Sequence, residues 1–179
     1  AVGIIAVNLS RYEIRDTWII GNNGTQTNVW NMAGDHIYYY AATEEGLKRA
    51  LISENNLANF SNWENSSNKY NLPPGPVQFT GLLNSHLLAG KTDSIFIQTG
   101  NNWTLLYHEA SWKIVQANVS GNYLLLSQTG PGNQARVILV TETGAIARTI
   151  RLPGVVSLPQ SAISDGNAVW VADLYEGLS

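Results

Sequence analysis

The sequence predicts an all-β fold, a segment of a β-propeller, from two observations. The first is a series of short apolar or alternating runs, rich in Val, Ile, Tyr and Trp and bounded by Gly, Asn, Asp or Pro. The second is an internal repeat, in which residues 34–47 resemble residues 165–178 without a gap. Together they indicate several small antiparallel sheets of similar construction.

Each expected strand is short and is separated from the next by a dipeptide typical of a tight turn. The runs cover residues 3–9, 37–42, 94–98, 104–107, 123–127, 137–141 and 168–172, with turns such as Asn23-Gly24, Gly121-Asn122 and Asp165-Gly166. Residues 44–53 carry Leu47, Leu51 and Ile52 at helical spacing, but Gly46 lies near their start and the pattern does not continue. We therefore expect a hairpin there, with Gly46 at positive φ.

The repeat sets the expected number of blades. It aligns Ala41 with Ala172, and residues 45–47 with 176–178, at an offset of 131 residues. Segments 4–8 and 13–15 resemble segments 137–141 and 145–147 at offsets of 132 to 133. Since a propeller blade spans about 40 to 50 residues, the offset of 131 corresponds to about three blades.

We therefore expect about three whole four-stranded blades and a partial blade at each end, in an incomplete ring. Aligned on Ala41, Leu88, Leu125 and Ala172, the blade-like units lie at approximately 1–25 (partial), 26–70, 76–116, 117–155 and 157–179 (partial). Residues 123–126 are apolar on both faces, as in a strand between two blades. We expect the chain to be an excerpt whose propeller the rest of the parent chain completes, and whose open edges make it behave poorly alone.

Composition excludes several kinds of partner and site. Ten Lys+Arg against thirteen Asp+Glu give a net charge of -3, which argues against a nucleic-acid or anionic-membrane surface. No apolar run reaches the roughly 18 residues that a membrane-spanning helix needs. The absence of Cys removes disulfides, thiolate nucleophiles and zinc sites built on sulfur.

Candidate catalytic and metal-ligating residues are few. His36, His86 and His108 lack any HxH or HExxH spacing. Glu44 with Glu45, and Asp173 with Glu176, could form acid–base pairs, but both occupy equivalent turns, where acidic residues suit a solvated loop. Asp16 and the turn 21–24 are rich in oxygen ligands but lack the spaced acids of a calcium loop. We expect no catalytic residue, metal or cofactor, and no enzyme.

The tryptophans admit two interpretations. Trp30, Trp63, Trp103, Trp112 and Trp170 could stack on sugar rings beside Asn side chains, or they could fill the space between blades. Trp170 alternates within its strand, which favours the filling role, whereas Trp63 and Trp103 lie beside Asn62 and Asn102 and leave both roles open. The sequence assigns no binding residue.

The segments 39–47 and 170–178 share an aromatic residue, a small residue, polar residues and Gly-Leu, a pattern that resembles propeller blades of the two-component-regulator type. More narrowly, residues 3–9, 13–24 and 40–47 resemble the N-terminal propeller of PorZ-like proteins, which belong to the type IX secretion system of Bacteroidetes. The resemblance implies a protein at the cell surface or in the periplasm of a Gram-negative bacterium.

The PorZ-like resemblance implies a non-catalytic binding and assembly module of a surface-attachment complex. Its expected partners are other secretion-complex proteins, such as a sortase-like subunit, and lipopolysaccharide, without nucleic acid or membrane insertion. Two alternatives stay open. One is the extracytoplasmic sensing propeller of a hybrid two-component regulator that binds an oligosaccharide. The other is a propeller enzyme, such as a lactonase or lyase, with acidic or His residues around a central metal.

Overall fold

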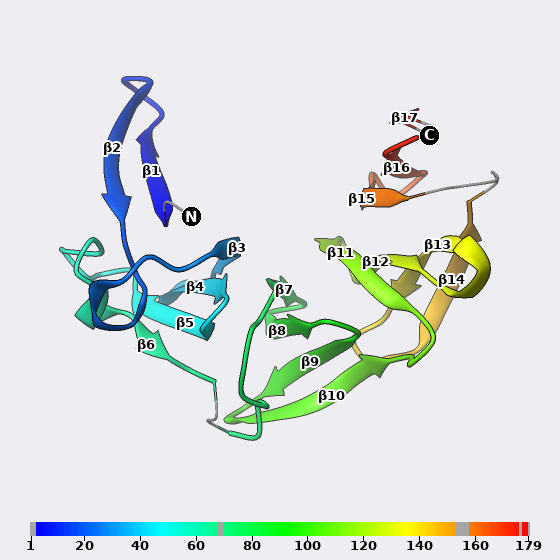
Figure 1. The fold of residues 1–179 in the computed structure, drawn as a ribbon, viewed down its shortest axis with the longest axis horizontal. Helices are drawn as coiled ribbons and strands as arrows, with labels where there is room; N and C mark the ends of the chain where they lie inside the picture. Colours follow the sequence, from blue (N-terminus) through cyan, green and yellow to red (C-terminus); the bar gives the residue numbers. More distant parts are fainter. Residues whose placement is uncertain (1–2, 68–69, 153–157, 176, 179) are drawn as a thin grey trace. The chain divides into compact units, whose positions relative to one another are not determined.

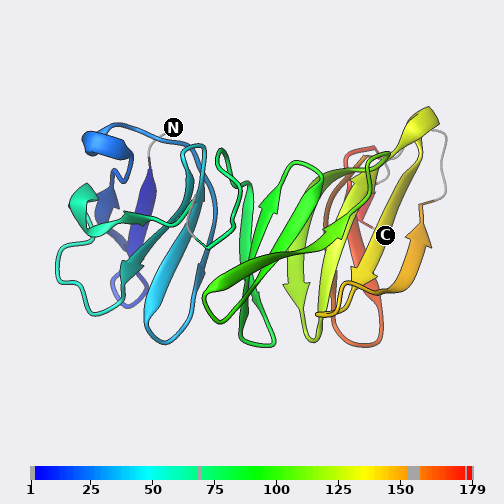
Figure 2. The same ribbon diagram turned by 90° about the horizontal axis from the view of Figure 1, so that it is seen from below.

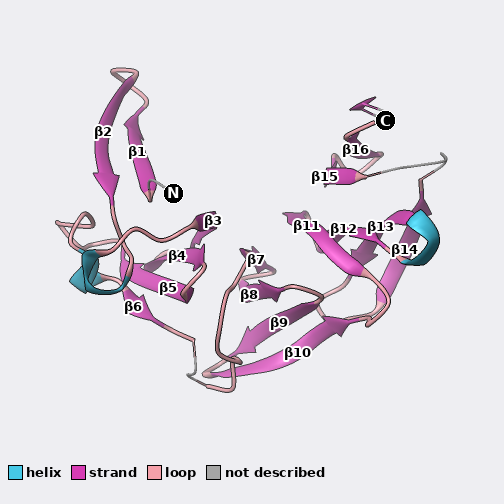
Figure 3. Ribbon diagram, viewed as in Figure 1, coloured by secondary structure: helices cyan, strands magenta, loops and turns pink. Residues whose placement is uncertain are grey.

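The structure is a computed structural model that describes residues 3–67, 70–152, 158–175 and 177–178. Almost all of the regular structure is strand (Figures 1 and 3). The chain divides into two compact units, residues 1–80 and 81–179. No described helix is long and apolar enough to cross a membrane.

The first unit contains a two-stranded and a four-stranded antiparallel sheet. The smaller sheet pairs β1 (Ile4–Asn8) with β2 (Glu13–Trp18). The larger has the order β3 (Val29–Gly34), β4 (Tyr38–Thr43), β5 (Gly46–Leu51) and β6 (Glu64–Asn65). Short 3-10 turns, η1 (Asn22–Gly24) and η2 (Phe60–Asn62), lie in the connections.

The second unit contains three further sheets in chain order, and β7 lies at the boundary between the units. One sheet comprises β7 (Phe79–Leu83), β8 (His86–Lys91), β9 (Ser94–Thr99) and β10 (Asn102–His108). The next comprises β11 (Lys113–Ser120), β12 (Tyr123–Thr129), β13 (Ala135–Val140) and β14 (Ile146–Arg151), with η3 (Pro131–Asn133) between β12 and β13. The last comprises β15 (Pro159–Ser164), β16 (Val169–Asp173) and β17 (Gly177–Leu178).

The expected fold class is confirmed, because every sheet is a meander in which consecutive strands run in opposite directions (Figure 2). The hairpin expected in residues 44–53 is also confirmed. Thr43 pairs with Gly46 across a two-residue turn, and Gly46 has a φ of 122°. The expected boundary between the blade-like units 76–116 and 117–155 is wrong, because it falls inside β11. The connection between the sheets β7–β10 and β11–β14 lies at residues 109–112. Residues 155 and 157, used for the last boundary, lie outside the described residues.

The partial blade at the start of the chain corresponds to the last two strands of a blade. Both β1–β2 and β13–β14 carry a register shift, between Ala6 and Val7 in the first and between Leu139 and Val140 in the second. These positions are separated by 133 residues, which agrees with the repeat found in the sequence.

The repeat alignment is wrong by one residue in β16. The β3–β4 hairpin joins Gly34 to Tyr39, and the β15–β16 hairpin joins Ser164 to Val169, so equivalent strand positions differ by 130. Ala41 therefore corresponds to Val171, and both are buried, whereas Ala172 is exposed. The error arose because the loop after β16 is one residue longer than the turn after β4. A shift of one residue in a strand reverses the face of every side chain.

The sheets bury apolar side chains face to face. In the first unit, Ile4 and Trp18 of β1–β2 share a core with Ala41, Ala50 and Trp63 of the segment 29–65. In the second unit, one face of β11–β14 contributes Leu125, Val137 and Leu139 to a core with Ala162 and Val171 of β15–β16. The other face of β11–β14 is buried as well, through Leu124, Leu126, Ile138 and Val140. The expectation that this strand lies between two covered faces is therefore confirmed for Leu124, Leu125 and Leu126, whereas Tyr123 at the start of β12 is 38% exposed.

Candidate functional site

The three predicted histidines do not converge. His36 is exposed in the β3–β4 turn, His86 begins β8, and His108 ends β10. His108 Nδ1 lies 3.1 Å from Ser94 Oγ and 3.6 Å from Asp93 Oδ1. Across residues 3–67, 70–152, 158–175 and 177–178, no three His, Cys, Asp or Glu side chains gather as a metal site would require.

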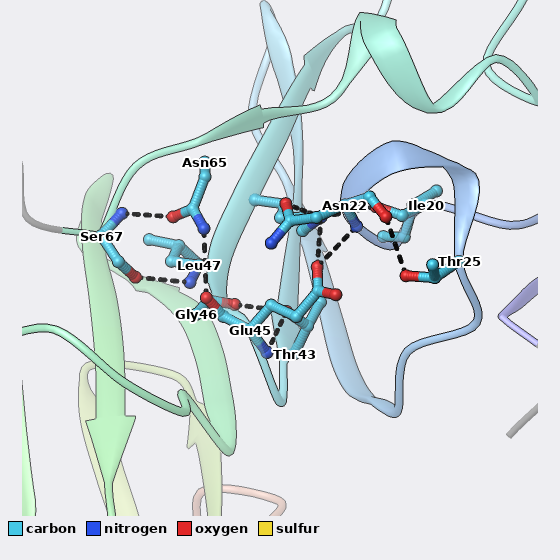
Figure 4. A network of polar contacts seen from close by, with 10 residues as sticks. Ile20, Asn22, Thr25, Thr43, Glu45, Gly46, Leu47, Asn65 and Ser67 are labelled. Atoms are coloured by element: carbon cyan, nitrogen blue, oxygen red, sulfur yellow. Dashed lines mark hydrogen bonds and ion pairs between the residues drawn. The ribbon is translucent and has the colours of Figure 1, made fainter.

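The turn acids have structural partners. Glu45 Oε2 lies 2.7 Å from Nζ of the buried Lys48 and accepts the Asn22 N–H at 2.8 Å. Lys48 Nζ also donates to the Ile20 carbonyl at 2.6 Å and to Asn22 Oδ1 at 3.1 Å, which fastens the oxygen-rich turn to β5. Glu44 accepts a hydrogen bond from Asn28 Nδ2 at 2.9 Å. The carboxylates are thereby occupied in holding the loop, as Figure 4 shows around Glu45 and Asn22.

Asp16 and Asp173, the other acidic residues considered as candidates, also accept hydrogen bonds from nearby groups of the chain. Asp16 accepts from Thr17 N–H at 2.8 Å and from Trp18 Nε1 at 3.1 Å. Asp173 Oδ1 accepts from Tyr175 N–H at 2.9 Å, and its predicted companion Glu176 lies outside the described residues.

Trp170 does not fill space between the described sheets, because it is 45% exposed, so its predicted filling role stays a prediction. Trp170 lies on the face of β16 opposite Val171, and its Nε1 donates to Asp165 Oδ2 at 3.1 Å. Trp63 and Trp103, for which both roles were open, are buried and fill the interior. Trp30 is 47% exposed. Sequence alternation could not distinguish these cases because it identifies two faces without showing which face is covered.

The candidate site is a groove of about 750 Å³ in the second unit. Its two rims are the β11–β12 turn and the β15–β16 turn, and its floor comes from β13, β14 and the start of β16. The groove lies beside the start of β16, at Ala168 and Val169, and the described residues of β17 pair with its other end, at Ala172 and Asp173. The lining residues are Ser120, Gly121, Asn122, Tyr123, Leu139, Ala147, Arg148, Ile150, Ser164, Asp165, Gly166, Asn167, Ala168 and Val169.

Hydrogen bonds hold the two rims in place. Ser120 Oγ donates to the Ser164 carbonyl at 2.6 Å and accepts the Ser164 N–H at 3.2 Å. Hydrogen bonds from the Ala168 N–H, the Trp170 indole and the Asn167 N–H lower the pKa of Asp165, so its carboxylate is ionised and engaged within its own turn. The rims are therefore built before any ligand arrives, which reduces the ordering cost of binding.

Polar groups suited to recognition lie around an apolar floor. Leu139, Ile150 and Val169 line the floor, and the ring of Tyr123 is 38% exposed beside them. The side chains of Asn122, Asn167 and Arg148 make no hydrogen bond to any described residue, so they can pair with a ligand. Amides can serve as both donors and acceptors to hydroxyl groups, and guanidinium pairs with anions. This arrangement can bind an amphipathic polyol such as a glycan, and its described lining residues include no pair of acidic side chains.

Sequence reasoning missed this groove. Gly121-Asn122 and Asp165-Gly166 were recognised only as turn signals, and Arg148 had no neighbouring motif. The groove could have been predicted from two turns that contain Asn, at 121–122 and 165–167, because each joins the first two strands of its sheet.

The repeated four-stranded meanders packed face to face define this chain as part of a β-propeller. Residues 1–64 match the family described as the type IX secretion system PorZ N-terminal β-propeller domain, so this part of the chain is similar to that family. A comparison with curated protein sequences gives no match.

Solved structures support the propeller fold over nearly the whole chain. The chain is similar to PorZ of Porphyromonas gingivalis, with 16% identity and a TM-score of 0.67 over 99% of this chain and 22% of PorZ. It is also similar to the extracellular domain of the putative one-component system BT4673 of B. thetaiotaomicron, with 12% identity and a TM-score of 0.67 over 96% of this chain and 23% of that domain. The computationally designed Ika4 protein gives 12% identity and a TM-score of 0.59, over 90% of this chain and 94% of Ika4. The chain spans about a fifth of the length of PorZ.

Proposed function

We propose that the chain is a non-catalytic, extracytoplasmic binding module in the surface machinery of a type IX secretion system. The family match over residues 1–64 supports this role, and PorZ itself is described as an essential bacterial surface component of that system. The observation that carries the proposal is the groove of the second unit, where Asn122, Asn167 and Arg148 surround an apolar floor. Its partners in this role are other secretion-complex proteins, including a sortase-like subunit, and lipopolysaccharide.

The groove favours a glycan that carries an anionic group. Tyr123 and the aliphatic floor suit the apolar face of a pyranose ring, and the two Asn amides suit its hydroxyl groups. Among the described residues that line the groove, Arg148 supplies the only positive charge. Since guanidinium forms bidentate pairs with phosphate or carboxylate, Arg148 is the residue that selects an acidic glycan over a neutral one.

The test measures binding of delipidated lipopolysaccharide polysaccharide by calorimetry. We expect Arg148→Ala to weaken binding at least about tenfold, as loss of one charged hydrogen-bonding partner does. Arg151→Ala is the matched control, because Arg151 is an exposed arginine of the same strand that does not line the groove. The proposal fails if the wild-type chain binds no polysaccharide, or if the two variants bind equally.

A second candidate is the sensing propeller of a hybrid two-component regulator. The observation that favours it is the similarity to the extracellular domain of BT4673, described in a further structure as a putative hybrid two-component system, at the same TM-score as PorZ. The same titration separates the two roles. Tight binding of a neutral oligosaccharide, with an affinity that Arg148→Ala does not change, would favour the sensor role.

A further inference from the structure

A smaller cavity of about 330 Å³ lies in the second unit and is lined by residues of the sheets β7–β10 and β11–β14. Its lining includes His86 of β8, Ile97 of β9 and Thr104 of β10, together with Glu142 and Thr143 of the β13–β14 turn. We call it the β9–β10 pocket. None of these residues belongs to the first or the last sheet, so the pocket does not depend on the faces that those two sheets leave exposed.

The β9–β10 pocket and the groove contain equivalent positions of consecutive sheets. The sequence repeat aligns Leu88 of β8 with Leu125 of β12. In the structure Leu88 pairs with Ile97, and Leu125 pairs with Leu139. Ile97 in the pocket and Leu139 in the groove therefore occupy the same place in their sheets.

Two further lining positions correspond in the same way. On the next strand, the partner of the shared apolar position is Thr104 in the pocket and Arg148 in the groove. The strands β8 and β12 each begin two residues before the aligned leucine, with His86 in the pocket and Tyr123 in the groove. The fold therefore forms a cavity at the same place in successive sheets, and the side chains that line it differ.

The two cavities lie at the same end of the second unit. Both β11 and β13 run antiparallel to β12, so the turns that follow them lie at one end, as Figure 2 shows. Asn84 Nδ2 in the β7–β8 turn donates to Glu142 Oε2 at 2.7 Å, which holds that turn at this end as well. The β13–β14 hairpin separates the cavities, because Thr143 lines the pocket and Arg148 lines the groove. Since packed sheets lie about 10 Å apart, one extended ligand can reach both.

The β9–β10 pocket is rich in hydroxyl groups and contains an acid in place of the groove's cation. The side chains of His86, Thr99 and Thr104 make no hydrogen bond to any described residue. These groups and the carboxylate of Glu142 can donate to or accept from sugar hydroxyls. The carboxylate repels an anionic group, since like charges brought together are unfavourable. The pocket therefore suits a neutral sugar, whereas Arg148 in the groove suits an acidic one.

We propose that the groove and the β9–β10 pocket are consecutive subsites for one polysaccharide chain, with an acidic sugar at Arg148 and a neutral sugar at Thr104. The ligand class is then a polysaccharide that contains both kinds of sugar, and not a single acidic sugar. This inference rests on the glycan-binding role proposed above, because it extends that site to a longer ligand. Occupation of the first subsite makes the second contact intramolecular, which raises the affinity for a ligand that spans both.

The experiment is calorimetry with delipidated lipopolysaccharide polysaccharide that has been hydrolysed and separated by size. Short fragments can fill only one cavity, and long fragments of several repeating units can fill both. We expect the wild type to bind long fragments at least about tenfold more tightly than short ones. A double variant, His86→Ala with Thr104→Val, should weaken the binding of long fragments at least about fivefold and leave that of short fragments unchanged. Arg148→Ala should weaken both.

Matched controls separate the pocket from general effects of substitution. Thr149→Val with His36→Ala removes the same groups from two exposed residues that line neither cavity, and it should bind both fragments like the wild type. This comparison also separates bridging from the larger number of binding units in a long fragment. Circular dichroism and thermal unfolding verify the fold of each variant, and Thr99→Val, at an exposed residue of the pocket, replaces the double variant if that one does not fold.

Three outcomes overturn the inference while the proposed function stands on the Arg148-dependent binding of short fragments. They are equal wild-type affinities for the two lengths, a pocket variant that binds long fragments like the wild type, and a folded pocket variant that loses affinity equally for both lengths. A wild-type protein that binds no fragment overturns the proposed function and this inference with it.

Discussion

Arg136 contacts side chains from several elements of the second unit. Its guanidinium lies 3.7 Å from the centroid of the Trp112 ring, donates from Nε to Gln128 Oε1 at 2.9 Å, and forms an ion pair with Glu109. Tyr107 completes the cluster with a hydrogen bond from its hydroxyl to Glu109 Oε2 at 2.9 Å. These groups come from β10, from the turn after it and from β12–β13, so the cluster fastens consecutive sheets to each other.

Stability should depend on the ionisation of Glu109. Burial alone would raise the pKa of Glu109, but the hydrogen bonds from Arg136 and Tyr107 and the charge of Arg136 outweigh it and lower that pKa. A lowered folded-state pKa stabilises the protein above the unfolded-state pKa, and that contribution is lost as the pH falls through the folded-state value. We therefore expect the urea concentration at the unfolding midpoint to decrease as the pH is lowered below 4.5, the ordinary pKa of Glu. This decrease should be steeper for the wild type than for Glu109→Gln. Glu13→Gln, at an exposed position, should keep the wild-type slope, and equal slopes for all three proteins would contradict the prediction.

The β4–β5 hairpin shows what a single turn residue contributes to an element. Thr43 Oγ1 donates to the Gly46 carbonyl at 2.7 Å, and Leu47 N–H donates to Ser67 Oγ at 3.0 Å. Gly46 itself has a φ of 122°, and a Cβ placed there would lie 2.9 Å from Ser67 Cβ. The chain therefore needs glycine for both its backbone conformation and its space.

Gly46→Ala should destabilise the first unit by more than about 2 kcal/mol, since it adds a steric clash to the strain of a positive φ. Gly100→Ala is the matched control: its φ is 60° and no atom lies within 4 Å of the added Cβ, so strain alone of about 1 kcal/mol is expected. Urea unfolding followed by tryptophan fluorescence measures both changes. Equal losses would show that the contact with Ser67 contributes nothing.

Sequence patterns predicted the elements better than their registers. Runs such as 94–98 and 123–127 match β9 and β12 because turn residues and alternation are local properties. The repeat, in contrast, placed Ala172 where Val171 lies, because an ungapped comparison cannot locate one extra loop residue. Since strand side chains alternate, that single residue decided whether the position faces the core.

At the scale of the whole molecule, side chains in similar strands contribute unequally to the free energy of unfolding. Leu126 in β12 is fully buried and Ile163 in β15 is 56% exposed, although both are aliphatic residues of regular strands. We expect Leu126→Ala to cost about 2–5 kcal/mol, because it leaves a cavity in a covered face. Ile163→Ala should cost less than about 1 kcal/mol, because more than half of this residue is already exposed. Urea denaturation of both variants gives the comparison, and similar losses of stability would contradict the exposed position of Ile163.

The sequence by itself determined that this chain is built from repeated antiparallel meanders, where its tight turns lie, and that its N-terminal region is PorZ-like. These properties are encoded in short-range alternation, in glycine and asparagine at turns, and in a repeat of whole segments. Only the tertiary structure decided that Lys48 is buried against Ile20 and Glu45, that Trp170 is exposed while Trp63 is not, and that two turns form one groove with Arg148. The physical reason is that burial and convergence depend on which sheet covers which face, and a strand's own residues do not record what packs against it.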